Sequence, residues 1–184
     1  RVYSVHLSGK FSGTIASAEV ARSQIDGVKV VDSLLATGGI ALLVDRMLAR
    51  IDQGVTEQEL DAYIEHFLAK RTFTFLPTTL DQLHKGGRIG HASHLMGTLL
   101  NIKPVLTIED GVIEVYKKVR GIRQALEAMV AGALEVTEPG STCYVSLSHG
   151  LNEPGLAQMR ELLAQVTDRD VQIDILFCGI CHSD

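Results

Sequence analysis

Short apolar runs alternate with longer amphipathic ones over the first 75 residues, and this alternation restricts the fold more than any other feature of the chain. The runs at Arg1–Leu7 and Val28–Ser33 are rich in β-branched residues and predict buried strands. Helical apolar spacing follows each run, at residues 14–24, 38–53 and 56–70. Because strands that alternate with helices are typical of a parallel sheet, we predict an α/β fold in which residues 1–75 form part of a parallel α/β domain.

Residues 76–184 show a different pattern. Two runs with period-two alternation are joined through Asp110–Gly111, which predicts a β-hairpin. Apolar periodicity and the positions of glycine and proline also predict helices at residues 80–85, 93–99, 123–135 and 154–166, and strands at residues 142–148 and 171–178. We therefore predict a smaller α+β domain, in which one small sheet carries helices on one face.

The composition argues against several classes of protein. Charged residues make up 21% of the chain and the net charge is −5, whereas nucleic-acid binding needs local positive charge. No apolar run reaches the ~18 residues of a membrane span, and no export signal opens the chain. Three cysteines do not form a disulfide framework. We expect a cytoplasmic protein that has no transmembrane segment and does not bind nucleic acid.

The stretch LSGKFSGTIAS is the first that could carry chemistry. A predicted strand stops, two glycines turn the chain and a helix begins, with Ser8, Ser12 and Thr14 in the turn. Backbone N–H groups at a helix start are unpaired and attract an anion, to which nearby hydroxyls can also donate. An ordinary helix cap by Ser12 explains the same pattern equally well.

Asp32 and Ser33 end the second predicted strand and lie near this turn if the two strands are neighbours. Asp32 could then orient a hydroxyl or the backbone, although its spacing alone favours an ordinary turn or cap residue.

The segment LHKGGRIGHASHLMGTLLNIKP is the most distinctive of the chain. Arg88 and two lysines bring positive charge to its Gly-rich backbone. Among its histidines only His91 and His94 form a close pair, and no carboxylate or cysteine accompanies them at metal-ligand spacing. We therefore expect solvated histidines and no metal site.

A basic run, YKKVRGIR, leaves a predicted strand and enters a helix. Alternation places Lys118 and Arg120 on one face, where they could bind a phosphate or an acidic partner. The exposed face of an edge strand would give the same pattern.

The chain ends in FCGICHSD, in which Cys178, Cys181 and His182 have the spacing that attaches c-type haem. Haem attachment needs export, for which there is no signal, and a second axial ligand, for which there is no candidate. A zinc or redox pair is also weakly supported, because the remaining cysteine, Cys143, is distant.

Three motifs together resemble one family. SGKFSGTIASA resembles the S-S-x-L-S-G-T-x-x-S-A turn of the DegV family, and LHKGGRIGHASHLMGTLLNIKPVLTIEDG is similar to its L-x-K-G-G-R-I…G-x-L-L-x-I-K-P-[IV]-L-x-x-x-x-G block. KKVRGIRQAL resembles its K-x-R-x-x-[KR]-A-L. The resemblance implies a bacterial cytoplasmic protein of two domains that buries the tail of one long-chain fatty acid between them. It also implies a fragment, since the family's N-terminal segment is absent.

Site residues follow from the resemblance by position. Ser12 matches the serine that hydrogen-bonds the fatty-acid carboxylate, with Thr14 and Ser8 beside it, and His182 matches a pocket histidine. Arg88, Lys118 and Arg120 match basic family positions, which we assign to partner docking or to phosphate proximity.

Several family members serve as the acyl-carrying subunit of fatty acid kinase, whose ATP-binding partner phosphorylates the carboxylate. The resemblance thus implies a lipid-binding protein with a fatty acid as its ligand, no cofactor and no catalytic nucleophile. Two alternatives stay open: a hydrolase or phosphotransferase that uses Ser12, Asp32 and His182, and a structural fragment with an incomplete pocket.

Overall fold

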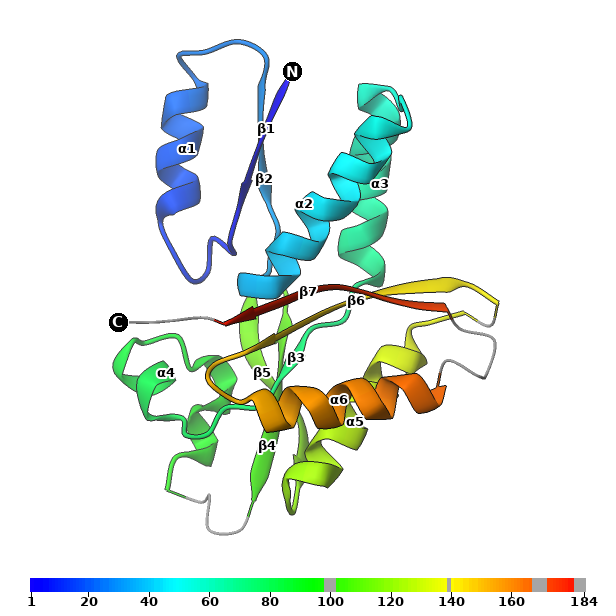
Figure 1. The fold of residues 1–184 in the computed structure, drawn as a ribbon. Coiled ribbons are helices and arrows are strands. Elements are labelled where there is room, and N and C mark those ends of the chain that lie inside the picture. Colours follow the sequence, from blue (N-terminus) through cyan, green and yellow to red (C-terminus); the bar gives the residue numbers. More distant parts are fainter. Residues whose placement is uncertain (98–101, 139, 167–171, 181–184) are drawn as a thin grey trace.

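The computed structural model describes residues 1–97, 102–138, 140–166 and 172–180, the last range by its backbone alone. These residues form three small sheets with helices packed around them (Figure 1). No helix in the described ranges combines the length and the apolar character needed to cross a membrane.

The first sheet pairs β1 (Val2–His6) with β2 (Val28–Asp32) in parallel, which confirms the predicted α/β pattern. Figure 1 shows α1 (Thr14–Arg22) on one side of this pair, and α2 (Thr37–Asp52) and α3 (Glu57–Lys70) on the other. The core between β2, α2 and α3 is aliphatic and consists of Val31, Leu43, Met47, Leu60 and Ile64.

Polar contacts fix α3 at its start and along its length. The Thr56 hydroxyl accepts from the backbone N–H of Glu59, whose carboxylate accepts from the backbone N–H of Thr56. These two bonds form a capping box at the start of the helix predicted at residues 56–70. Asp61 accepts hydrogen bonds from Lys29 on β2, at 2.8 Å, and from the Tyr3 hydroxyl on β1, at 2.9 Å. These donors hold the pKa of Asp61 below its usual value, Lys29 having the largest effect.

The second sheet is antiparallel and contains β3 (Thr74–Phe75), β4 (Lys103–Glu109) and β5 (Val112–Val119) in that order. Asp110 and Gly111 join β4 to β5 with φ angles of 47° and 80°, as a tight hairpin turn requires, so the predicted hairpin is confirmed. Helix α5 (Ile122–Glu135) covers the sheet, and Gly132 leaves room for the ring of Tyr116 against it.

The segment between β3 and β4 forms two short helices, α4 (Asp81–Lys85) and the 3₁₀ helix η1 (Gly90–Leu95). The α-helix predicted at residues 93–99 is wrong where the structure describes it, because η1 starts earlier and Gly97, with a φ of 78°, follows its end. Ala92 and Leu95 on η1 pack against Leu106 and Ile113 of the sheet below.

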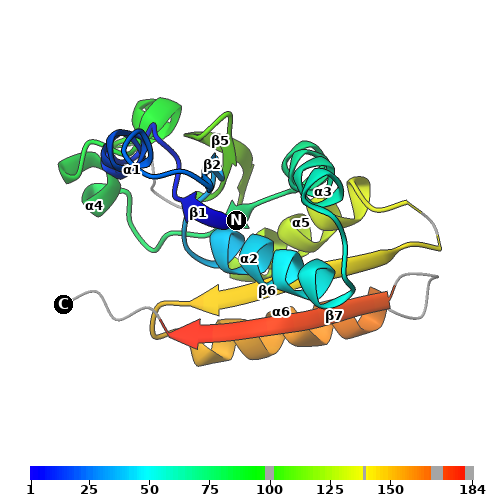
Figure 2. The same ribbon diagram turned by 90° about the horizontal axis from the view of Figure 1, so that it is seen from above.

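The third sheet pairs β6 (Thr142–His149) with β7 (Gln172–Ile180) in parallel, with α6 (Glu153–Val166) between them in sequence. A strand–helix–strand unit of this kind forms a parallel pair. Because this pair is a sheet separate from β3–β4–β5 in the described residues, the expectation of one small sheet after residue 75 is wrong. Figure 2 shows this pair between α6 and α2. The contact of α2 with β6 crosses the proposed division into residues 1–75 and 76–184, which stays a prediction.

Candidate functional site

The turn from Ser8 to Thr14 connects β1 to α1 at the carboxyl end of the first sheet, where ligands of open α/β sheets bind. Ser8 closes this turn. Its carbonyl oxygen accepts from the backbone N–H groups of Phe11, at 2.9 Å, and Ser12, at 3.2 Å. Its hydroxyl oxygen accepts from the N–H of Lys10 at 3.1 Å. The turn is therefore a compact unit rather than an open loop.

Ser12 is half-buried, and its hydroxyl oxygen accepts from the backbone N–H of Thr14 at 3.3 Å. The N-cap of α1 is Gly13, which has no side chain, so Ser12 is not the ordinary helix cap that the sequence left open. Within the described residues the hydroxyl proton of Ser12 has no acceptor, and the backbone N–H groups of Gly13 and Ile15 have none either. Thr14 itself is exposed. The start of α1 thus offers several hydrogen-bond donors that suit an anion.

Ser8 has a different position from Ser12. It is 0% exposed, and its hydroxyl donates to the carbonyl oxygen of Gly111, in the β4–β5 hairpin, at 2.9 Å. Its proton is therefore used within the protein, where this hydrogen bond joins the turn to the hairpin. The sequence predicted the Asp110–Gly111 hairpin but gave no sign of this long-range contact.

Asp32 stands at the end of β2 and contacts the same turn. One carboxylate oxygen accepts from the backbone N–H of Gly9 at 3.1 Å, and the other accepts from that of Leu34 at 2.9 Å. The sequence suggested that Asp32 could orient either a hydroxyl or the backbone. These two contacts show that it orients the backbone. Both oxygens point to backbone groups, so Asp32 orients no histidine within the described part of the chain.

Arg88 links the Gly-rich segment to the turn. Its side-chain Nε donates to the carbonyl oxygen of Phe11 at 3.1 Å, and its guanidinium also contacts the carbonyl oxygen of Gly86. The ring of Phe11 packs against the core that contains Leu80 and Leu106. The Ser8–Thr14 turn is therefore held from both the first and the second sheet.

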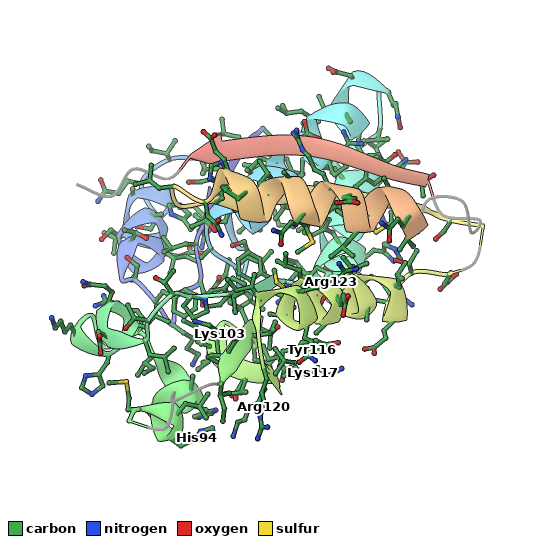
Figure 3. All side chains as sticks on the ribbon, turned by 60° about the horizontal axis from the view of Figure 1, so that its bottom comes forward. His94, Lys103, Tyr116, Lys117, Arg120 and Arg123 are labelled. Carbon is green, nitrogen blue, oxygen red and sulfur yellow. The ribbon has the colours of Figure 1, made fainter. Side chains whose placement is uncertain are left out.

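Lys118 and Arg120 lie elsewhere, at the carboxyl end of β5, and both are exposed. Lys118 Nζ lies 3.4 Å from Nε2 of His94 on η1. Lys103 begins β4 opposite Val119, the last residue of β5, and Figure 3 labels it together with Lys117, Arg120 and Arg123 in the region where β5 leads into α5. Of the three basic residues predicted from the resemblance, Arg88 thus contacts the turn, whereas Lys118 and Arg120 lie at the carboxyl end of β5.

Two of the three histidines of the Gly-rich segment contact other protein groups. His91 contacts the Glu114 carboxylate, and His94 Nδ1 lies 2.7 Å from the carbonyl oxygen of His91. The described ranges contain no group of three or more histidine, cysteine or acidic side chains placed to hold a metal ion.

The structure describes little of the C-terminal motif FCGICHSD. Cys181 and His182 lie outside the described residues, and only the backbone of Cys178 is described. Strand β7 ends at Ile180, and Figure 2 shows the carboxyl ends of β6 and β7 pointing to the side that carries α1 and α4.

Two surface hollows, of about 420 and 370 Å³, lie away from the turn. The larger hollow lies between the carboxyl ends of α3 and α5, and the smaller hollow lies between β5 and α5. Burial lowers the pKa of Arg71, which borders the larger hollow. Neither hollow includes a residue of the predicted fatty-acid site.

Known proteins resemble the chain in both sequence and structure. A curated Thermotoga maritima protein named fatty acid-binding protein is 36% identical over 160 residues, which cover 85% of this chain and 56% of that relative. The structure of a Thermus thermophilus DegV family protein, described for its fatty acid binding, matches with a TM-score of 0.83 and 32% identity over 96% of this chain and 64% of that one. The Streptococcus pneumoniae fatty acid kinase B3 protein, loaded with linoleic acid, matches with a TM-score of 0.80 and 27% identity over 95% and 63%.

This chain thus spans between 56% and 64% of the length of these three proteins. The sequence profile of the DegV family, described as uncharacterised proteins, matches residues 1–182. Together with the shared fold, this match shows that the chain belongs to the DegV family.

Proposed function

We propose that this protein binds one long-chain fatty acid and holds its carboxylate at the start of α1. The observation that carries the proposal is a set of free donors there: the hydroxyl proton of Ser12 and the N–H groups of Gly13 and Ile15, for which the described residues provide no acceptor. Charge-assisted hydrogen bonds from such donors bind a carboxylate strongly. The relatives named for fatty-acid binding support the choice of ligand.

The exposed Thr14 hydroxyl and His182 are further proposed contacts of the carboxylate. The acyl tail would lie between the predicted domains 1–75 and 76–184, in a cytoplasmic protein that needs no other cofactor. Ser8 supports the turn that carries these groups. A binding role suits the described contacts better than a hydrolase or phosphotransferase, because Ser12 and Asp32 contact backbone N–H groups and not a base.

Replacing Ser12 by alanine removes the hydroxyl donor and is expected to weaken fatty-acid binding. A hydrogen bond to a charged group contributes about 1.5–3 kcal/mol, so we expect a loss of affinity of roughly ten- to a hundredfold. Titration with hexadecanoic acid, followed by calorimetry or by a fluorescent competitor, measures this loss.

Ser17→Ala is the matched control, because Ser17 is an exposed serine one turn further along α1. This variant is expected to bind like the wild type. If Ser12→Ala also binds hexadecanoic acid like the wild type, the proposed carboxylate site is wrong.

We further propose that the bound acid is presented to the ATP-binding subunit of a fatty acid kinase. The similarity to the pneumococcal kinase B3 protein supports this role. Arg88 contacts the turn that carries Ser12, a position that suits an acyl phosphate formed there. Lys118 and Arg120 are exposed, and Lys117 and Arg123 lie within three residues of one or the other in the chain, so this segment suits docking of an acidic surface.

Reversing the charge at Arg120 is expected to weaken association with the kinase subunit by at least about tenfold, since a like-charge contact replaces an attraction. Fatty-acid binding should not change, because Arg120 lies away from the turn. Surface plasmon resonance of Arg120→Glu tests this, with Arg160→Glu as the control on the exposed face of α6. Equal association of both variants would contradict docking at this end of β5.

A further inference from the structure

One carboxylate joins the two loops that leave the first sheet. Asp32 accepts from the N–H of Gly9, which follows β1, and from the N–H of Leu34, which follows β2. The side chain is half-buried at the carboxyl edge of the sheet. An ionised carboxylate that accepts two backbone N–H groups forms stronger hydrogen bonds than a neutral acceptor would.

The chain around Gly9 is closely packed. A Cβ atom on Gly9 would lie 3.1 Å from the Asp32 carboxylate and 3.1 Å from the Ile15 side chain, in the first turn of α1. Gly9 therefore lies between Asp32 and the start of α1, so a shift of Asp32 would change the position of Gly9 relative to the helix. From Gly9 the chain reaches Ser12 in three residues, and those residues are braced by the backbone and hydroxyl of Ser8.

A carboxylate at this place is notable on electrostatic grounds. A negative charge near a site for a negatively charged ligand opposes binding, so charge alone would favour a neutral residue. What Asp32 supplies is geometry, because it provides two acceptors for N–H groups on two different loops. Fixing a binding loop before the ligand arrives lowers the entropy lost on binding.

We propose that Asp32 is a positioning residue for the fatty-acid carboxylate: it fixes Gly9 and thereby keeps the Ser12 hydroxyl and the free N–H groups of Gly13 and Ile15 in place. The inference rests on the proposed function and adds to it a residue that does not touch the ligand.

Two probes separate this role from a general effect on folding. Hexadecanoic acid carries the carboxylate, whereas hexadecanol carries the same tail without the charge. Asp32→Ala is expected to weaken binding of the acid by roughly tenfold and to leave binding of the alcohol unchanged, because only the acid depends on the turn. Ser12→Ala should reduce the same acid-to-alcohol ratio. Asp26→Ala, at the other end of β2 and exposed, should keep the ratio of the wild type.

Asp32→Asn separates positioning from charge. Asparagine keeps the size of the side chain but only one acceptor oxygen, so positioning predicts weaker binding of the acid. An effect of charge alone predicts stronger binding, because the repulsion of the ligand is removed. If circular dichroism shows that Asp32→Ala does not fold, Asp32→Asn alone tests the positioning role.

The outcomes are distinguishable. The positioning role is overturned if both Asp32 variants bind the acid like the wild type. It is also overturned if both variants lose the same factor of affinity for the acid and for the alcohol. If the wild type binds acid and alcohol equally and Ser12→Ala changes nothing, the proposed carboxylate site itself fails and the positioning role fails with it. A selective loss of the acid in both Asp32 variants supports the inference.

Discussion

The variant Gly90→Ala is expected to lose about 2 to 5 kcal/mol of its free energy of unfolding. Gly90 has a φ of 56°, a left-handed conformation that an alanine adopts only at a cost. A Cβ atom there would also overlap the carbonyl oxygen of Ile113 and lie 3.0 Å from its backbone nitrogen. Since Gly90 begins η1, the change would push Ala92 and Leu95 out of the core.

Urea denaturation of Gly90→Ala and Gly87→Ala measures this effect against a matched control. Gly87 has a φ of 70°, but apart from its two neighbours in the chain no described residue has an atom within 4 Å of the position of an added Cβ. Gly87→Ala should therefore cost only the conformational part, about 1 to 2 kcal/mol. Equal losses in the two variants would show that η1 does not pack against β5 as described.

The variant Gly111→Ala is expected to reduce both stability and fatty-acid affinity. Gly111 has a φ of 80°, and an added Cβ atom would overlap the hydroxyl oxygen of Ser8. Ser8 would have to leave the carbonyl oxygen of Gly111, and the turn that carries Ser12 would move with it. We expect a loss of about 2 to 4 kcal/mol in the free energy of unfolding, with weaker binding of hexadecanoic acid.

Gly121→Ala is the control for this variant. Gly121 also has a positive φ, 94°, and apart from its two neighbours in the chain no described residue has an atom within 4 Å of the position of an added Cβ. Its substitution should lower stability without changing the affinity of the folded protein for the acid. Affinities are compared in conditions where each variant is folded, as shown by circular dichroism. If Gly111→Ala binds the acid as tightly as Gly121→Ala, the contact between hairpin and turn does not support the site.

Local features of this fold could be predicted from the sequence. The alternation of strands and helices in the first 75 residues gave the parallel pairing of β1 and β2. The apolar spacing at residues 56–70 identified a helix, and the Asp110–Gly111 pair identified a hairpin. Each of these depends on the conformational preferences of a few consecutive residues, which the sequence displays directly.

Features that depend on distant residues could not be predicted in this way. Ser8 and Gly111 are 103 positions apart, and Arg88 and Phe11 are 77 apart, yet each pair shares a hydrogen bond. Sequence patterns alone did not distinguish Ser12, which keeps a free hydroxyl proton among the described residues, from Ser8, which is buried and bonded. Tertiary packing decides which hydroxyl of the turn is available to a ligand.

The division of the strands into sheets could not be predicted from local patterns either. Residues 142–148 and 171–178 were predicted as strands, and the structure contains strands at both places, β6 and β7. They form a sheet apart from β3–β4–β5 and pack against α2, a long-range contact that local periodicity does not display. Local periodicity gives the type of an element and says little about its partner.

The central claim is that this chain binds a long-chain fatty acid, and native mass spectrometry tests it most directly. The purified protein is incubated with a mixture of long-chain fatty acids, analysed intact, and analysed again after extraction with organic solvent. Our account predicts a complex with one acid per chain, whose excess mass disappears on extraction and is recovered as a free long-chain fatty acid. A protein that carries no acid after this incubation would contradict the account.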